Sequence, residues 1–135
     1  MSFTIDDTTT SLVTNLIALT GHKFGDGELP QDPEPAANEP YGIVTTIPGG
    51  SSYGGMAGSM EMASAIFQIT IVGHTNSQCR KFQQKIHSVL DDMWFSIVGC
   101  LGPARVAVGG IVKEDDRTYV ANDTLYMEIT QQEEA

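Results

Sequence analysis

The sequence predicts an α+β protein, a small two-layer sandwich in which two helices pack on an antiparallel or mixed four-stranded β-sheet, in the order α-β-β-α-β-β. Segments with the helical spacing of apolar residues alternate along the chain with segments in which apolar residues occupy every second position. The chain has 135 residues, 41% of them hydrophobic, which is the length and apolar content of one globular domain. Residues 1–135 are therefore expected to fold as a single domain, with both helices and strands in one layer pair.

The first helix is predicted over residues 6–20. Asp6, Asp7 and Thr8 offer side-chain oxygens that can accept hydrogen bonds from the free backbone N–H groups of a helix N-terminus. Four apolar residues at helical spacing predict one buried face: Leu12, Val13, Leu16 and Ile17. Gly21 then ends the helix, because glycine adopts the left-handed conformation of a C-terminal cap without strain.

Two segments are predicted to be irregular. Residues 24–40 are rich in proline and acidic residues and contain no basic residue, so they are expected to form an extended arm or an exposed loop. This acidic arm is either a passive linker or a segment laid over a neighbouring subunit. Residues 48–63 are rich in glycine and methionine and are expected to form a loop that either stays mobile or becomes ordered on assembly.

Two strands and the second helix follow a simpler pattern. Tyr41–Ile47 is rich in β-branched residues, and residues 65–73 alternate with Phe67, Ile69 and Ile71 on one face. Thr75 and Gln78 have the spacing of a helix capping box. Beyond them lie an apolar stripe and a solvent-facing basic group: Cys79, Phe82, Ile86, Val89, Leu90 and Met93 in the stripe, and Arg80, Lys81 and Lys85 in the group.

The C-terminal part is predicted to form a β-hairpin. Residues 106–113 are expected to be a strand with a bulge at Gly109 and Gly110. Four residues form the turn: Glu114, Asp115, Asp116 and Arg117. The last strand is predicted over residues 119–130, with inward and outward side chains in alternation: Leu125, Met127 and Ile129 inward, Tyr126 and Glu128 outward.

Composition argues against several classes of protein. The net charge is −10, which disfavours a dedicated nucleic-acid grip because such a grip needs clustered basic residues. No apolar run is long enough for a spanning helix, and the first residues lack the pattern of a secretory signal. Cys79 and Cys100 are expected to be free thiols in a protein made in the cytoplasm.

The residues that carry chemistry form no convincing site. His87 and Asp91 lie one helical turn apart, but the adjacent Ser88 points to another side of the helix, so an ordinary surface contact is expected. A solvated acidic cluster is expected from Glu114, Asp115, Asp116 and Asp123, with weak binding of Mg²⁺ or Ca²⁺ at subunit contacts as the alternative. The glycine-rich segment lacks the ending of a phosphate-binding loop. The sequence therefore predicts no catalytic residue, no cofactor and no resident metal.

Charge is unevenly distributed, since every basic residue except Lys23 lies at or after Arg80. Copies of one subunit could pair the basic second helix with the acidic arm of the next copy, a heterologous contact that closes into a ring where the rotation allows it. The alternative is a surface whose charges are simply scattered.

The element order and several short segments together form a familiar pattern. These segments are residues 39–44 (EPYGIV), 67–73 (FQITIVG), 76–90 (a helix opened by NSQ) and 108–129 (the closing hairpin). The chain resembles, over residues 5–130, the tail-terminator (tail-completion) proteins of long-tailed bacteriophages. The resemblance consists of the order of the elements and the positions of small residues.

This resemblance implies a structural virion protein, not an enzyme, at the head-proximal end of the tail. Six copies would form a ring that caps the completed tail tube, contacts the tail tube protein and the head–tail connector, and lets DNA pass without specific binding. No membrane partner is implied. The expected assembly contacts are Tyr53, Met56, Met60, Met62, Arg80, Lys81, Lys85, Glu114, Asp115, Asp116 and Arg117. A head–tail connector ring subunit is the first alternative, and a small ligand-binding domain or enzyme is the second.

Overall fold

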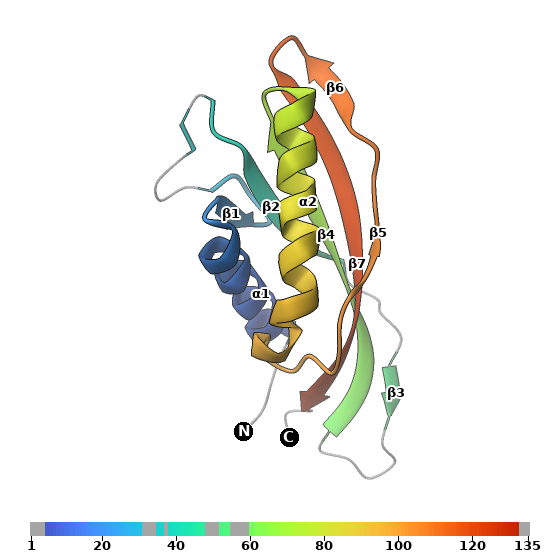
Figure 1. Ribbon diagram of the computed structural model, residues 1–135. Coiled ribbons are helices and arrows are strands. Elements are labelled where there is room, and N and C mark those ends of the chain that lie inside the picture. The colour runs from blue at the N-terminus through green and yellow to red at the C-terminus, as the bar shows by residue number, and fades with distance from the viewer. Residues whose placement is uncertain (1–4, 31–34, 37, 48–51, 55–59, 133–135) are drawn as a thin grey trace.

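Two helices cover one face of a twisted β-sheet in the computed structural model of the chain (Figure 1). The structure describes residues 5–30, 35–36, 38–47, 52–54 and 60–132. Their elements are α1 (Ile5–Thr20), β1 (Lys23–Asp26), β2 (Tyr41–Ile47), β3 (Ser52–Gly54), β4 (Met60–Gly73), α2 (Asn76–Met93), the 3₁₀ helix η1 (Trp94–Ser96), β5 (Arg105–Ala107), β6 (Val112–Asp115) and β7 (Thr118–Gln132). The predicted α+β class with two helices packed on a mixed sheet is confirmed.

The sheet is larger than predicted. Its strands follow the order β1-β2-β4-β7-β5, with β3 also paired to β4 and β6 to β7, so the described residues contain seven strands and not four. All pairs are antiparallel except β1 with β2. The predicted strand at 106–113 is two strands, because the chain leaves the sheet around Gly109 and returns at Val112. The other two additions, β1 and β3, lie in segments predicted to be irregular.

The acidic arm at 24–40 begins inside the sheet, so the prediction that it is irregular throughout is wrong at its start. Phe24 is 5% exposed and meets the ring of Phe82 edge-on, with the centroids 5.5 Å apart. Burial of this one large ring is worth about 2 kcal/mol, enough to hold a short edge strand among polar neighbours. At the other end of the arm, Lys23 pairs with Glu39 at 3.2 Å and Gln78 Nε2 donates to the Asn38 carbonyl. The described ends of the arm are thus bound to their own subunit.

The segment 48–63 also contains regular structure, contrary to the prediction. β4 begins at Met60, and its first residues pair with β3 on one side and with the end of β7 on the other. Because both edges of this part of β4 are paired, the small residues do not prevent a strand. These strands form a ribbon that projects beyond the helices in Figure 1. The backbones of Tyr53, Met60 and Met62 lie in this ribbon, whereas Met56 lies outside the described residues.

The core lies between the helices and the inner face of β2, β4 and β7. In α1, Leu12 and Leu16 are fully buried as predicted, whereas Ile17 is 42% exposed. The buried face of the helix is therefore rotated by part of a turn from the predicted face. The buried residues Thr8 and Thr9 also lie on the observed inner face of α1. Thr8 donates to the Val98 carbonyl at 2.8 Å and Thr9 bonds the hydroxyl of Thr46 at 2.9 Å. Thr8 is therefore a packing residue within the helix and does not cap it.

The second helix follows its prediction closely. The Thr75 hydroxyl accepts a hydrogen bond from the Gln78 backbone N–H, while the Gln78 side chain accepts from the backbone N–H of His74. The predicted apolar stripe is buried, with Val89 partly so. Gly21 ends α1 with φ of 74° and a hydrogen bond to the Ile17 carbonyl, as the C-cap prediction requires.

Candidate assembly surfaces and a buried polar network

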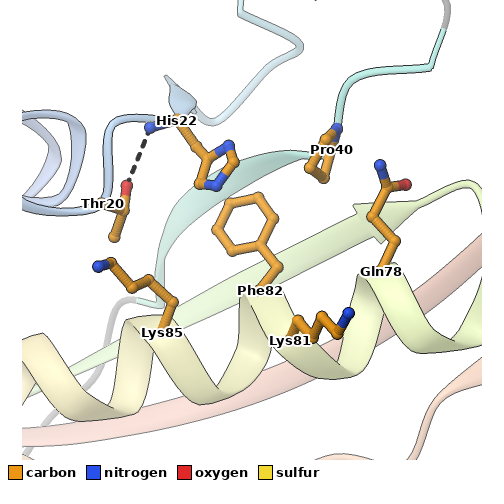
Figure 2. Close-up of a pocket in the computed structure, with 7 residues that line it drawn as sticks. All are labelled: Thr20, His22, Pro40, Gln78, Lys81, Phe82 and Lys85. Carbon is orange, nitrogen blue, oxygen red and sulfur yellow. Dashed lines mark hydrogen bonds between the residues drawn. The ribbon is translucent and has the colours of Figure 1, made fainter.

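A groove of about 460 Å³ lies between α2 and the connection from α1 to β1. Figure 2 shows the seven residues that line it: Thr20, His22, Pro40, Gln78, Lys81, Phe82 and Lys85. His22 stacks on Phe82 with the ring centroids 4.6 Å apart and 28° between the planes. The turn at Gly21 places His22 there, and the His22 backbone N–H donates to the Thr20 hydroxyl at 3.2 Å. The groove therefore has an aromatic floor held by neighbouring backbone.

Basic side chains gather along this groove. Arg80, Lys81 and Lys85 are exposed on α2, as predicted, and Lys81 and Lys85 line the groove one helical turn apart. None of the three forms an ion pair with a described residue. Two like charges at this spacing repel by a few tenths of a kcal/mol, roughly 0.2–0.5. The arrangement favours an anionic group in or above the groove.

The predicted acidic turn lies between β6 and β7 but is shorter than expected, because Glu114 and Asp115 are the last residues of β6 and only Asp116 and Arg117 form the turn itself. The four residues together are called the acidic turn. Glu114, Asp115, Asp116 and Arg117 are all exposed. The Arg117 backbone N–H donates to the Asp115 carboxylate at 2.9 Å; this hydrogen bond, followed by that from the Thr118 side chain, lowers the pKa of Asp115. The His74 ring bonds the Arg117 carbonyl at 2.9 Å, which fixes the base of the turn. The turn thus presents its carboxylates in an ordered backbone.

Asp123 does not belong to that acidic cluster, so the prediction that it joins Glu114, Asp115 and Asp116 at the surface is wrong. It is 0% exposed and points inward from β7 toward α2. Its Oδ1 accepts from the Gln83 side-chain amide at 2.7 Å and from the Gly109 backbone N–H at 2.9 Å, and its Oδ2 accepts from His87 Nε2 at 2.6 Å. Gln83 also donates to the Gly109 carbonyl at 3.0 Å. This network ties α2, β7 and the β5–β6 connection together.

The partner expected for His87 was wrong. Asp91, one turn away, is exposed, and the imidazole instead meets Asp123. The imidazole Nε2 and the Asp123 carboxylate lie 2.6 Å apart and share one hydrogen bond. A His–Asp pair can orient a general base, but the nearest hydroxyl in sequence, Ser88, donates to the Lys85 carbonyl. Within the described part of the chain, the pair joins α2 to β7.

The polar network around Asp123 also explains why residue 109 is a glycine. A Cβ built on Gly109 would lie 2.0 Å from the Asn122 carbonyl oxygen, whereas one on Gly110 meets nothing within 4 Å. Gly109→Ala is expected to lower the free energy of unfolding by about 2 kcal/mol, since the chain must move away from β7 and from Asp123. Gly110→Ala is the matched control and should change it by less than about 1 kcal/mol. Urea unfolding followed by the fluorescence of Trp94, the single tryptophan, measures both, and equal effects would contradict this account.

The two cysteines are unpaired, as predicted. Burial, and then the nearby charge of Asp123, raises the pKa of the Cys79 thiol, and burial raises that of Cys100. Since the thiolate is the reactive form, we expect Cys79 in a Cys100→Ser variant to be alkylated at neutral pH only as the protein opens. Mass spectrometry of iodoacetamide-treated samples, with and without urea, tests this. Alkylation of native Cys79 at the rate seen in urea would refute it.

The sheet face opposite the helices has a different character. Side chains of the three central strands alternate onto it, and those in its middle are uncharged: Tyr41, Ile43 and Thr45 of β2, Ile66, Gln68, Thr70 and Val72 of β4, and Val120, Asn122 and Thr124 of β7. At one end Arg105 lies over the ring of Tyr126, 5.7 Å from its centroid. No described helix covers this face. It forms a broad uncharged surface with many β-branched residues.

The fold and these surfaces define a small α+β protein with a polar network inside and surfaces of contrasting charge outside. Neither a protein-family model nor a curated protein matches the chain. Among the described residues, no group of three or more His, Cys, Asp and Glu side chains could hold a metal ion. No helix in the described ranges is long and apolar enough to cross a membrane.

Proposed function

We propose that the chain is a tail terminator of a long-tailed bacteriophage, a structural subunit of a ring that caps the finished tail tube and joins it to the head. The proposal rests on one observation, the order of elements shared with those proteins. In this chain α1 precedes β2, the long strand β4 leads after a two-residue link into the amphipathic helix α2, and β6 and β7 close the fold.

Three features of the chain support a role in assembly. Only 18% of the residues are charged, against about 25% in an average soluble domain. The sheet face opposite the helices is uncharged in its middle, a composition suited to burial against another protein. The ribbon of β3, β4 and β7 projects beyond the helices, which places it where a neighbouring ring such as the tail tube would meet it.

In this proposal the protein sits in the virion at the head-proximal end of the tail after synthesis in the host cytoplasm. Its partners are other copies of itself, the tail tube protein and the head–tail connector. The chain needs no cofactor and catalyses no reaction. With a net charge of −10, a ring of such subunits repels DNA phosphate and lets the genome slide through.

Electron microscopy of particles assembled without this chain tests the proposal. We expect overlong tails without heads, and a return to uniform tails when the wild-type chain is supplied in trans. Tails of normal length lying beside heads, or heads that have lost their DNA, would instead make the protein a head–tail connector. Ordinary infectious particles would refute both structural roles and favour a ligand-binding domain built on the groove.

A further inference from the structure

We infer that the groove along α2 receives the acidic β6–β7 turn of a second copy of this chain. The groove's lining includes Lys81 and Lys85, and the turn carries Glu114, Asp115 and Asp116. The inference rests on the proposed function, since it names the contact that would link neighbouring subunits of the ring.

The groove is suited to a short acidic segment. In a chain with seven basic residues and 17 acidic ones, two of the basic residues line one groove, and neither pairs with a described acid. Its volume of about 460 Å³ falls in the range that holds a small ligand or a few side chains. The ring of His22, stacked on the buried ring of Phe82, supplies a flat aromatic surface for the aliphatic parts of those side chains (Figure 2).

The turn is suited to the groove. Its carboxylates are exposed, and the backbone around them is already fixed by the bond from Arg117 to Asp115 and by the bond between His74 and the Arg117 carbonyl. An ordered segment loses little conformational freedom when it binds. Opposite charges on the two surfaces favour the correct encounter over others.

The two surfaces consist of different residues, so the contact is heterologous when each copy uses its groove toward one neighbour and its turn toward another. Each copy offers one groove and one turn, and the contact repeats from copy to copy. Such a series either closes into a ring or continues as a filament, depending on the rotation. The acidic residues at the end of α2, Asp91 and Asp92, offer a competing arrangement in which two α2 helices pair antiparallel as a closed dimer.

Charge reversal on each side, followed by mixing, tests the contact. One variant is Lys81→Glu/Lys85→Glu and the other is Glu114→Lys/Asp116→Lys, both made in the full-length chain and checked for folding by circular dichroism. At low ionic strength and micromolar to millimolar concentration, sedimentation velocity should show at least tenfold weaker association for each variant alone. An equimolar mixture should regain association, because each groove then meets a turn of opposite charge.

Matched controls separate this contact from a general effect of charge. Arg105→Glu lies on β5, outside the groove lining, and changes the net charge half as much as the groove variant does; it should leave association within about twofold of wild type. Asp91→Lys/Asp92→Lys is the control for the turn variant, because it changes the net charge by the same amount at a place outside the turn. If this last variant abolishes association while the turn variant does not, the helices pair with each other and the inference is wrong.

The remaining outcomes also decide the matter. A wild-type chain that stays monomeric over the whole range, or a mixture that does not recover, overturns the groove contact. Measurement of tail lengths tests the proposed function independently of the groove contact. Overlong tails without the chain, together with uniform tails made by both charge variants, would leave the proposed function standing and remove this interface.

Discussion

Replacement of Asp123 with alanine is expected to lower the free energy of unfolding by about 3–5 kcal/mol, a large part of the stability of a domain of this size. The carboxylate is fully buried and accepts three hydrogen bonds. Removing it leaves the Gly109 backbone N–H and one N–H of the Gln83 amide without their partner, while the other Gln83 N–H keeps its bond to the Gly109 carbonyl. Donors buried in this way lose their bonds to water and gain none in return.

Asp123→Asn is the matched control. Its side-chain oxygen can still accept from Gln83 and Gly109, so we expect a loss of about 1–2 kcal/mol, from the contact with His87 alone. Urea unfolding of both variants, followed by Trp94 fluorescence, gives the two values. If alanine costs no more than asparagine, the hydrogen bonds of Asp123 contribute little and the network does not hold the β5–β6 connection.

Asp123 also shows what sequence reasoning missed and why. The inward residues Leu125, Met127 and Ile129 were predicted from alternation, and the same alternation extended backward places position 123 on the inner face. The residue type, an aspartate near three other acids, argued instead for solvent. Its partners Gln83 and His87 come from α2, about 40 residues earlier in the chain, and no local pattern connects them.

Elements whose determinants are local were predicted well. The cap and stripe of α2 lie within twenty residues, and both are confirmed. The turn between the last two strands was placed correctly, although only Asp116 and Arg117 of its four predicted residues lie outside those strands. The strand β1 was missed because its stability depends on a contact between Phe24 and Phe82, far apart in sequence. Local proline and acidic content, which predicted a loop, says nothing about that contact.

The candidate assembly residues also differ in which of their properties the sequence alone could predict. Helical spacing brought Lys81 and Lys85 to one exposed side of α2, as expected. The groove that they line was not foreseen, because His22 and Pro40 reach it from the other side through the fold. The charge was therefore predictable from α2 alone, whereas the groove beside it could be found only from the tertiary structure.

Leu16→Ala is expected to destabilise the protein by about 3 kcal/mol, whereas Ile17→Ala should cost less than about 1 kcal/mol. Leu16 is fully buried against the core, and Ile17 is 42% exposed. Apolar spacing alone gave both residues the same role, so the pair tests where α1 actually faces the sheet.

The two changes are closely matched, because each shortens an aliphatic side chain to alanine at adjacent helical positions. Alanine favours the helix at both sites, so a difference between the variants reports burial and not helix propensity. Urea midpoints at constant m-value give the two free energies. Equal losses would restore the helix face predicted from sequence and would require Thr8 and Thr9 to leave the core. A larger loss for Leu16 would agree with an inner face that includes Leu16 together with Thr8 and Thr9, whose hydroxyls bond the Val98 carbonyl and the Thr46 hydroxyl.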